Sequence, residues 1–201
     1  MYPYFQYVNI PNLKTIQEEL WQNYDFIISS SSEYTKENDA KQSIGVLTVT
    51  LVKKDILLAS SPALVKYLTD VNLLEKLQIT ALITAGPGSP EKVHTDGVYQ
   101  NALNLPIHNC QDGFTLFYQP VEDRSVHVGK LTGAAIIENP GDVVTMSKVN
   151  SPHWINTFMP HKSLNNSNTN RYSLSLRFGK TWDTTIHLQT EFYEDNEDTK
   201  I

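Results

Sequence analysis

Apolar residues recur at helical spacing in two segments of the N-terminal third of the chain. In residues 11–24 they lie three, four and one positions apart, and in residues 61–77 they recur every three or four positions. This spacing puts them on one face of an α-helix, and proline near each start suits a first helical turn. Polar residues 29–43 predict a flexible loop, and the apolar run 46–52 predicts a strand.

Beyond Leu77 the pattern changes to short β-rich runs separated by turn sequences such as Asp112-Gly113 and Asn139-Pro140-Gly141-Asp142. The predicted strands are 79–85, 93–95, 102–107, 114–118, 134–137, 143–146 and 171–178. Many short strands without intervening helices are typical of an antiparallel sandwich or barrel. The expected fold class is α+β, mainly β, with the two N-terminal helices packed outside.

Length and charge add limits to this expectation. The chain has 201 residues, which suits one domain. We expect that domain to span residues 1–190, with helical support in 1–77 and a β core in 78–180, followed by an acidic, flexible tail at 191–201. The net charge of −6 comes mainly from residues 191–200, which hold five acids and one lysine. No basic patch is visible, so duplex nucleic acid is not an expected partner.

The single cysteine and the absence of long apolar runs exclude further classes. Cys110 is the only cysteine, so the chain forms neither an intramolecular disulfide nor a cysteine-based zinc cluster. The sequence shows no signal peptide and no apolar run of the ~18–20 residues that a membrane span needs. These features predict a soluble cytoplasmic protein without a membrane partner.

The chemically distinctive part of the β-rich region begins with His94-Thr95-Asp96 at a predicted strand end. Residues two apart in a strand lie on the same face, so His94 and Asp96 point to one side and Thr95 to the other. An imidazole beside a carboxylate provides two of the three ligands of the sites that hold non-haem Fe(II). Alone, the pattern also fits a surface turn capped by the aspartate.

A histidine and an arginine further along the chain supply the remaining groups. Arg171 follows His161 by ten residues, and a hairpin through the Asn-rich segment between them would bring the two side chains together. From Arg171 onward polar and apolar residues alternate, so one face of the strand carries Arg171, Ser173, Ser175 and Arg177. A guanidinium binds a planar carboxylate through two parallel hydrogen bonds, and Ser173 can donate another. A third metal ligand and a carboxylate-binding cation can therefore share one cavity.

In this order, the residues resemble the Fe(II)/2-oxoglutarate-dependent oxygenase superfamily, and are most similar to its small aspartyl- and prolyl-hydroxylase-like members. The matching segments are His94-x-Asp96, Ala102-Leu103-Asn104-Leu105-Pro106-Ile107, Phe117-Tyr118, Pro160-His161 and Arg171-x-Ser173-Leu174-Ser175. The resemblance covers residues 94–178 well, the preceding strand and Gly-Pro-Gly loop moderately, and the N-terminal helices hardly at all.

The resemblance implies a double-stranded β-helix, that is, a jelly roll or cupin-like barrel, with a metal at its open end. It implies that His94, Asp96 and His161 bind Fe(II), and that Arg171, helped by Ser173, binds the C5 carboxylate of 2-oxoglutarate. The reaction would hydroxylate a small-molecule or peptide substrate while 2-oxoglutarate and dioxygen yield succinate and carbon dioxide. A carboxylate ligand favours hydroxylation or desaturation over halogenation.

Several assignments stay open at this point. His153 also follows a proline and is the rival of His161, although it lies 18 residues before Arg171, which is long for the family. Asn104 and Tyr118 lie where the family often places a second contact to 2-oxoglutarate, and a role as hydrogen-bonded barrel residues is the other interpretation. The alternative functions are a cupin-type metal enzyme that does not use 2-oxoglutarate and a non-catalytic β-sandwich binding module.

Overall fold

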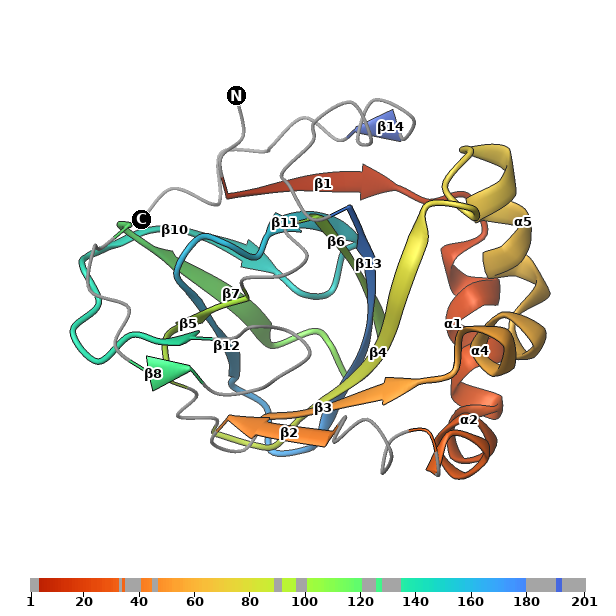
Figure 1. Cartoon of the computed structure of the whole chain (residues 1–201), viewed down its shortest axis with the longest axis horizontal. Coiled ribbons are helices and arrows are strands. Elements are labelled where there is room, and N and C mark those ends of the chain that lie inside the picture. The colour runs from red at the N-terminus through yellow and green to blue at the C-terminus, as the bar shows by residue number, and fades with distance from the viewer. Residues whose placement is uncertain are drawn as a thin grey trace.

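Two antiparallel sheets face each other in a computed structural model of the chain (Figure 1). The structure describes residues 4–32, 34, 41–44, 47–88, 92–96, 101–120, 126–127, 135–179 and 191–192. The larger sheet has eight strands in the order β14-β1-β11-β6-β13-β4-β3-β2, and the smaller has six in the order β10-β7-β12-β5-β9-β8. The two sheets enclose the space in which the candidate site lies.

Most strands predicted beyond Leu77 are present within one or two residues of their expected bounds. The strands of the larger sheet are β1 (Phe5–Asn9), β2 (Lys41–Ile44), β3 (Leu47–Val52), β4 (Leu77–Ala85), β6 (Asn101–His108), β11 (His153–Asn156), β13 (Arg171–Phe178) and β14 (Glu191–Phe192). The strands of the smaller sheet are β5 (His94–Thr95), β7 (Gly113–Tyr118), β8 (Val126–His127), β9 (Ala135–Ile136), β10 (Val143–Lys148) and β12 (His161–Asn165).

The strand order confirms the expected double-stranded β-helix. Strands β4, β6, β11 and β13 are neighbours in the larger sheet, while β5, β7, β10 and β12 belong to the smaller one. The chain therefore passes repeatedly from one sheet to the other as it winds, which is the connectivity of a jelly roll. Successive side chains of a strand point to opposite faces, so alternate residues of β6, β11 and β13 face the interior.

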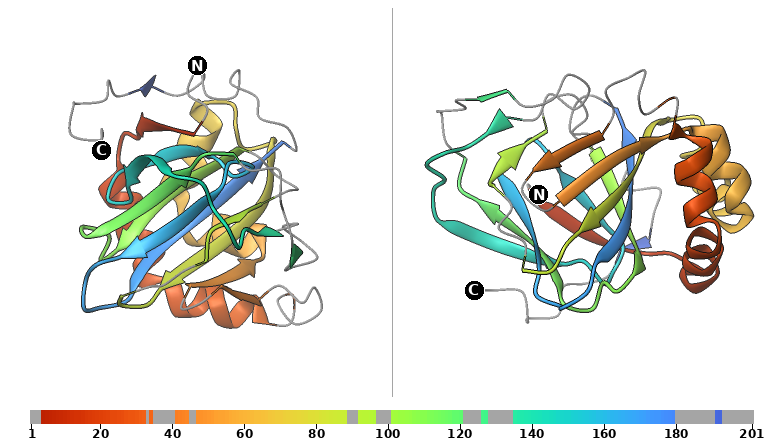
Figure 2. Two further views of the ribbon diagram at one scale, coloured as in Figure 1. Left: turned by 90° about the vertical axis from the view of Figure 1, so that its left-hand side faces the viewer. Right: turned by 90° about the horizontal axis from the view of Figure 1, so that it is seen from below.

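The helices of the described part of the chain pack on the outer face of the larger sheet, away from the smaller sheet (Figures 1 and 2). They are α1 (Leu13–Gln22), α2 (Tyr24–Ser30), α4 (Lys54–Ser60) and α5 (Pro62–Asp70). Buried side chains of these helices, including Ile16 and Leu64, join outward-facing residues of the sheet such as Leu103, Leu174 and Phe178 in one apolar core. The prediction that helices pack outside the β body is confirmed.

The helical region differs from the sequence prediction in its details. The helix expected over 61–77 ends at Asp70, where the chain turns through Asn72 in the left-handed conformation (φ 54°). Residues 71–77 continue the helix-like apolar spacing for another reason: Leu73 packs in the core after the helix has ended, and Leu77 is the first residue of β4. The flexible loop expected over 29–43 is wrong at its ends, since α2 runs through Ser30 and β2 begins at Lys41; residues 33 and 35–40 lie outside the described part.

The hairpin expected between His161 and Arg171 is also wrong. β12 pairs with β5 and β7, whereas β13 pairs with β4 and β6 in the other sheet. The buried Asn165 organises this crossing because its Nδ2 donates to the carbonyl oxygens of Ala85 (2.9 Å), Gly86 (3.2 Å) and Thr169 (2.8 Å). The Asn-rich segment thus connects the two sheets.

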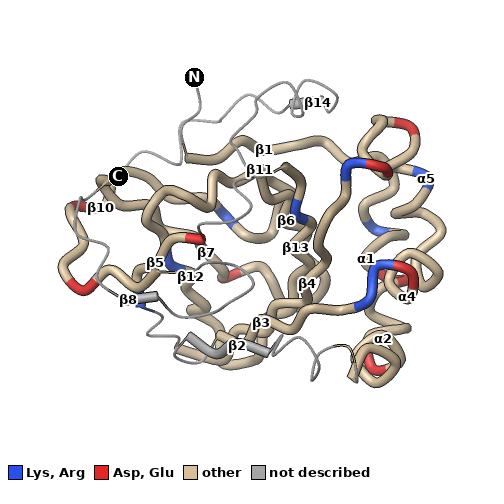
Figure 3. The backbone as a smooth tube through the Cα atoms, viewed as in Figure 1, with Lys and Arg blue, Asp and Glu red and all other residues tan. Residues whose placement is uncertain are grey.

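Among the residues that the structure describes, Lys, Arg, Asp and Glu positions are frequent along the helices, and others lie on the β strands (Figure 3). The first two residues of the predicted acidic tail form β14, which pairs with β1, and residues 193–201 lie outside the described part. Within the described residues, no helix combines the length and apolar composition needed to cross a membrane.

Candidate metal centre

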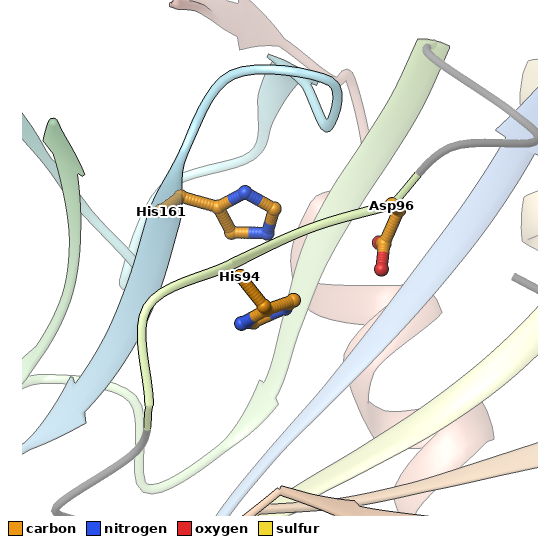
Figure 4. Close-up of side chains that lie close together, drawn as sticks. All are labelled: His94, Asp96 and His161. Atoms are coloured by element: carbon orange, nitrogen blue, oxygen red, sulfur yellow. The ribbon is translucent and has the colours of Figure 1, made fainter. Parts of the chain in front are cut away.

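Three potential metal ligands meet between β5 and β12 (Figure 4). His94 on β5 lies directly opposite His161 on β12 in the antiparallel ladder, and Asp96 follows two residues after His94. The backbone N–H of Asp96 donates to the carbonyl oxygen of Thr157 at 2.7 Å, which fixes the chain just after the strand. One ligand atom from each of the three side chains lies within 4.8 Å of the other two.

Hydrogen bonds to the backbone orient both imidazoles. The Nδ1 atom of His94 is 3.1 Å from the carbonyl oxygen of Lys92, and that of His161 is 2.8 Å from the carbonyl oxygen of Met159. A carbonyl oxygen only accepts, so Nδ1 carries the proton and Nε2 keeps a lone pair. Such outer contacts are typical of metal-binding histidines, because they fix the tautomer and the ring orientation.

Asp96 forms an ion pair with Arg177 that the sequence reasoning did not assign. The Nη2 atom of Arg177 is 2.9 Å from Oδ2 of Asp96, and both side chains are largely buried. Burial acts to raise the pKa of Asp96, but the Arg177 guanidinium and the two histidines outweigh it, so the pKa is lowered. The carboxylate is therefore ionised at neutral pH.

The same surroundings keep His161 neutral. Burial, followed by the neighbouring His94, lowers the pKa of His161 to about 3. A metal ligand must be an unprotonated imidazole, so no proton has to leave this residue before it binds a metal at neutral pH. Two imidazoles and one carboxylate match the donor set of non-haem Fe(II) sites.

Arg171 lies inside the barrel, but at the other end of β13 from Arg177. Its side chain is 1% exposed and reaches across to Gly113 on the smaller sheet. A Cβ at Gly113 would lie 2.8 Å from Cδ and 2.9 Å from Nη1 of Arg171, so only glycine leaves room for this arginine. It is thus Arg177, and not Arg171, that lies beside the candidate ligands, while Arg171 marks the far end of the same inner face.

Between the two arginines the inner face of the larger sheet is polar. Ser175 on β13 pairs with Asn104 on β6, which pairs with His153 on β11, so the three residues form one row across three strands. Ser175 and His153 are fully buried, and Asn104 is partly buried. Within the described part of the chain, Ser175 Oγ, Asn104 Oδ1 and His153 Nε2 are buried atoms that make no hydrogen bond. Ser173, 4% exposed, lies on the same face nearer Arg171. Such atoms suit an interior that holds a polar ligand.

Two residues singled out from the sequence are placed apart from the three candidate ligands. His153 is fully buried but is not part of the ligand cluster. The Tyr118 ring packs with Val93 and Ile137, whereas the neighbouring Phe117 belongs to the apolar cluster that contains Phe5. Because adjacent strand residues point to opposite faces, Tyr118 faces away from the interior, and we leave it out of the proposed site.

Comparison with known proteins finds weak structural likenesses. A prolyl-4-hydroxylase from Pseudomonas putida is 11% identical with a TM-score of 0.46, over 89% of this chain and 93% of that one. Oxalate decarboxylase from Bacillus subtilis is 12% identical with a TM-score of 0.38, over 74% of this chain and 29% of that one. The chain thus spans about a third or less of such decarboxylases. No protein-family model and no curated protein matches the sequence.

Proposed function

We propose that the protein is a non-haem Fe(II)- and 2-oxoglutarate-dependent dioxygenase that hydroxylates a small-molecule or peptide substrate, with residues 1–190 as its single oxygenase domain. The observation that carries this proposal is the meeting of His94, Asp96 and His161 inside a double-stranded β-helix, with their ligand atoms within 4.8 Å of one another. The donor set, the fixed tautomers and the ionised carboxylate all suit Fe(II).

Each residue of the inner face has a task in this proposal. His94, Asp96 and His161 hold the metal, and Arg177 keeps the Asp96 carboxylate in place through their ion pair. Arg171 and Ser173 bind the C5 carboxylate of 2-oxoglutarate, and Asn104 and Ser175 contact it from the neighbouring row. When bound, Fe(II) and 2-oxoglutarate supply the oxidative chemistry that turns dioxygen into a hydroxylating agent, with succinate and carbon dioxide released.

The buried Arg171 favours this function over a cupin-type enzyme that works without 2-oxoglutarate. Such an enzyme needs the three ligands but no second cation. Arg171 is 1% exposed and lies on the inner face, and a guanidinium suits a planar carboxylate because it offers two parallel hydrogen bonds. A dicarboxylate cosubstrate supplies such a carboxylate.

Anaerobic titration of the Fe(II)-loaded protein with 2-oxoglutarate tests the proposal. We expect a weak visible charge-transfer band that is lost in His161→Ala and kept in His153→Ala. Arg171→Ala should weaken 2-oxoglutarate binding by about 1.5–3 kcal/mol, because a charge-assisted hydrogen bond is removed. A band that survives in His161→Ala, or an affinity unchanged in Arg171→Ala, would contradict the assignment.

A further inference from the structure

The His153 imidazole makes the same backbone contact as the two candidate histidine ligands, but it lies outside the cluster that they form with Asp96. Its Nδ1 atom is 2.8 Å from the carbonyl oxygen of Ser151, the same contact two residues upstream that His94 and His161 make. Nδ1 therefore carries the proton of the neutral ring, and Nε2 is left as a lone pair. That Nε2 atom is fully buried and makes no hydrogen bond within the described part of the chain.

The groups around His153 come from three strands. Tyr7 on β1 places its ring edge-on at 6.0 Å between centroids, and its hydroxyl oxygen already accepts from the backbone N–H of Lys148 at 2.6 Å. Asn104 on β6 lies opposite His153 in the ladder. From β13, Ser175 continues the row, and the Arg171 guanidinium is near enough to act electrostatically on the imidazole. Arg171 is thus the charged group of the described residues that acts on His153.

A carboxylate bound to Arg171 would bring its oxygens toward the same space. A carboxylate oxygen and an unprotonated Nε2 are both acceptors, so they repel each other unless a proton lies between them. Ser175 can supply one donor from its hydroxyl, but it cannot remove the lone pair of His153. Protonation of His153 removes the conflict, because Nε2–H then donates a charge-assisted hydrogen bond.

We propose that binding of the C5 carboxylate of 2-oxoglutarate beside Arg171 is coupled to the uptake of one proton from solvent by Nε2 of His153, which then donates a hydrogen bond to that carboxylate. This inference rests on the proposed function and adds His153 to the residues that bind the cosubstrate. It also explains why an imidazole outside the metal cluster is held in the same tautomer as the ligands.

The electrostatics agree with this coupling. In the ligand-free protein, burial and then Arg171 lower the pKa of His153 to about 4. A bound carboxylate offsets the charge of Arg171 and adds an acceptor, and both effects raise the pKa of the imidazole. Between the two pKa values the complex holds one more proton than the free protein, so binding weakens as the pH rises through that interval.

Calorimetry of 2-oxoglutarate binding to the Mn(II)-loaded protein tests the proposal. Titrations in two buffers of different ionisation enthalpy give the number of protons taken up on binding. They are done at about pH 6, above the pKa of free His153. We expect uptake approaching one proton in the wild type, and an affinity that falls up to about tenfold per pH unit between the pKa of free His153 and its higher pKa in the complex, and that levels off above the latter. His153→Gln, whose amide donates without gaining a proton, should bind with no uptake and with a pH-independent affinity.

His108→Gln is the matched control, because His108 stacks on Trp21 at 4.0 Å between ring centroids on the helical side of the sheet. It should behave as the wild type does. Binding without proton uptake in the wild type, or equal uptake in wild type and His153→Gln, overturns the proposal while leaving the dioxygenase assignment intact. Failure of 2-oxoglutarate to bind the loaded wild type removes both. The wild-type pH series decides the matter even if His153→Gln does not fold.

Discussion

At the scale of single residues, the ion pair between Arg177 and Asp96 is a strong determinant of the candidate site. Removing one partner of a buried ion pair leaves the other charge buried without compensation. Arg177→Met should therefore destabilise the metal-free protein by about 3–5 kcal/mol. Bound Mn(II) should restore part of that loss because the cation neutralises Asp96. Denaturant unfolding with and without Mn(II) measures both effects.

Lys66→Met provides the control for Arg177→Met. Lys66 and Asp70 also form an ion pair at 2.7 Å, but both side chains are more than half exposed, and such pairs contribute about 0–1 kcal/mol. A loss in Arg177→Met no larger than that in Lys66→Met would show that the buried pair does not support Asp96.

Gly113 is the second residue whose role can be isolated. Gly113→Ala adds a methyl group where Arg171 now lies, so the guanidinium must move. We expect 2-oxoglutarate affinity to fall by about 1.5–3 kcal/mol, the value of a lost charge-assisted hydrogen bond, with Mn(II) affinity unchanged. Calorimetric titration of both ligands measures this.

Gly141→Ala is the comparison for Gly113→Ala, since a Cβ there meets Cβ of Gln119 at 3.0 Å and leaves Arg171 in place. Equal losses of 2-oxoglutarate affinity in the two variants would mean that displacement of Arg171 is not the cause.

The spacing of residues predicts part of this site and misses the rest for a physical reason. Alternation along 171–178 indicates that Arg171 and Arg177 share a face, and period-two geometry pairs His94 with Asp96. Neither pattern tells how β13 is shifted relative to β5, and that shift decides which arginine meets Asp96. His153 could be identified as a candidate, but its role depends on neighbours from strands far apart in the sequence.

At the scale of elements, the crossing from β12 to β13 is held by one side chain. Asn165→Ala would leave three carbonyl oxygens without the donor they now share, and a stranded buried polar group costs about 1–3 kcal/mol. We expect a stability loss of at least that size by thermal or denaturant unfolding. Asn166→Ala, at an exposed neighbouring position, should change stability little; equal effects would refute the special role of Asn165.

Two strands that the sequence pattern missed, β11 and β12, do not alternate between a buried apolar face and an exposed polar one. All four residues of β11 are buried, so its sequence does not alternate between apolar and polar. β12 carries His161 and Asn165 inward as polar residues, which conceals the expected pattern. The longer strands β4, β6 and β13 were predictable because their apolar residues that pack on the helices, such as Leu82, Leu103 and Leu174, recur at every second position or in short apolar runs.

At the scale of the whole molecule, buried neutral histidines make stability depend on pH. Burial lowers the pKa of His153 to about 4 and that of His161 to about 3, while an unfolded chain binds these protons near 6.5. The unfolded state therefore holds more protons between those values, and stability is lost as the pH falls. Asp96, whose pKa is also lowered, adds to the loss only below its unfolded pKa of about 3.9.

We expect the metal-free protein to lose about 3–4 kcal/mol of unfolding free energy between pH 7 and pH 5 from these two histidines together. Urea unfolding at several pH values measures this, and His153→Gln should show about half the dependence. A stability that stays constant over this range would mean that the histidines are not buried in the neutral form.

The most direct test of the metal centre is the anomalous scattering of crystals grown with Mn(II) and 2-oxoglutarate without oxygen. We expect one strong peak about 2.0–2.3 Å from Nε2 of His94, Nε2 of His161 and a carboxylate oxygen of Asp96, with the C5 carboxylate of the cosubstrate at Arg171. A peak at other residues, or none between these three side chains at saturating Mn(II), would contradict the proposed metal site and the function built on it.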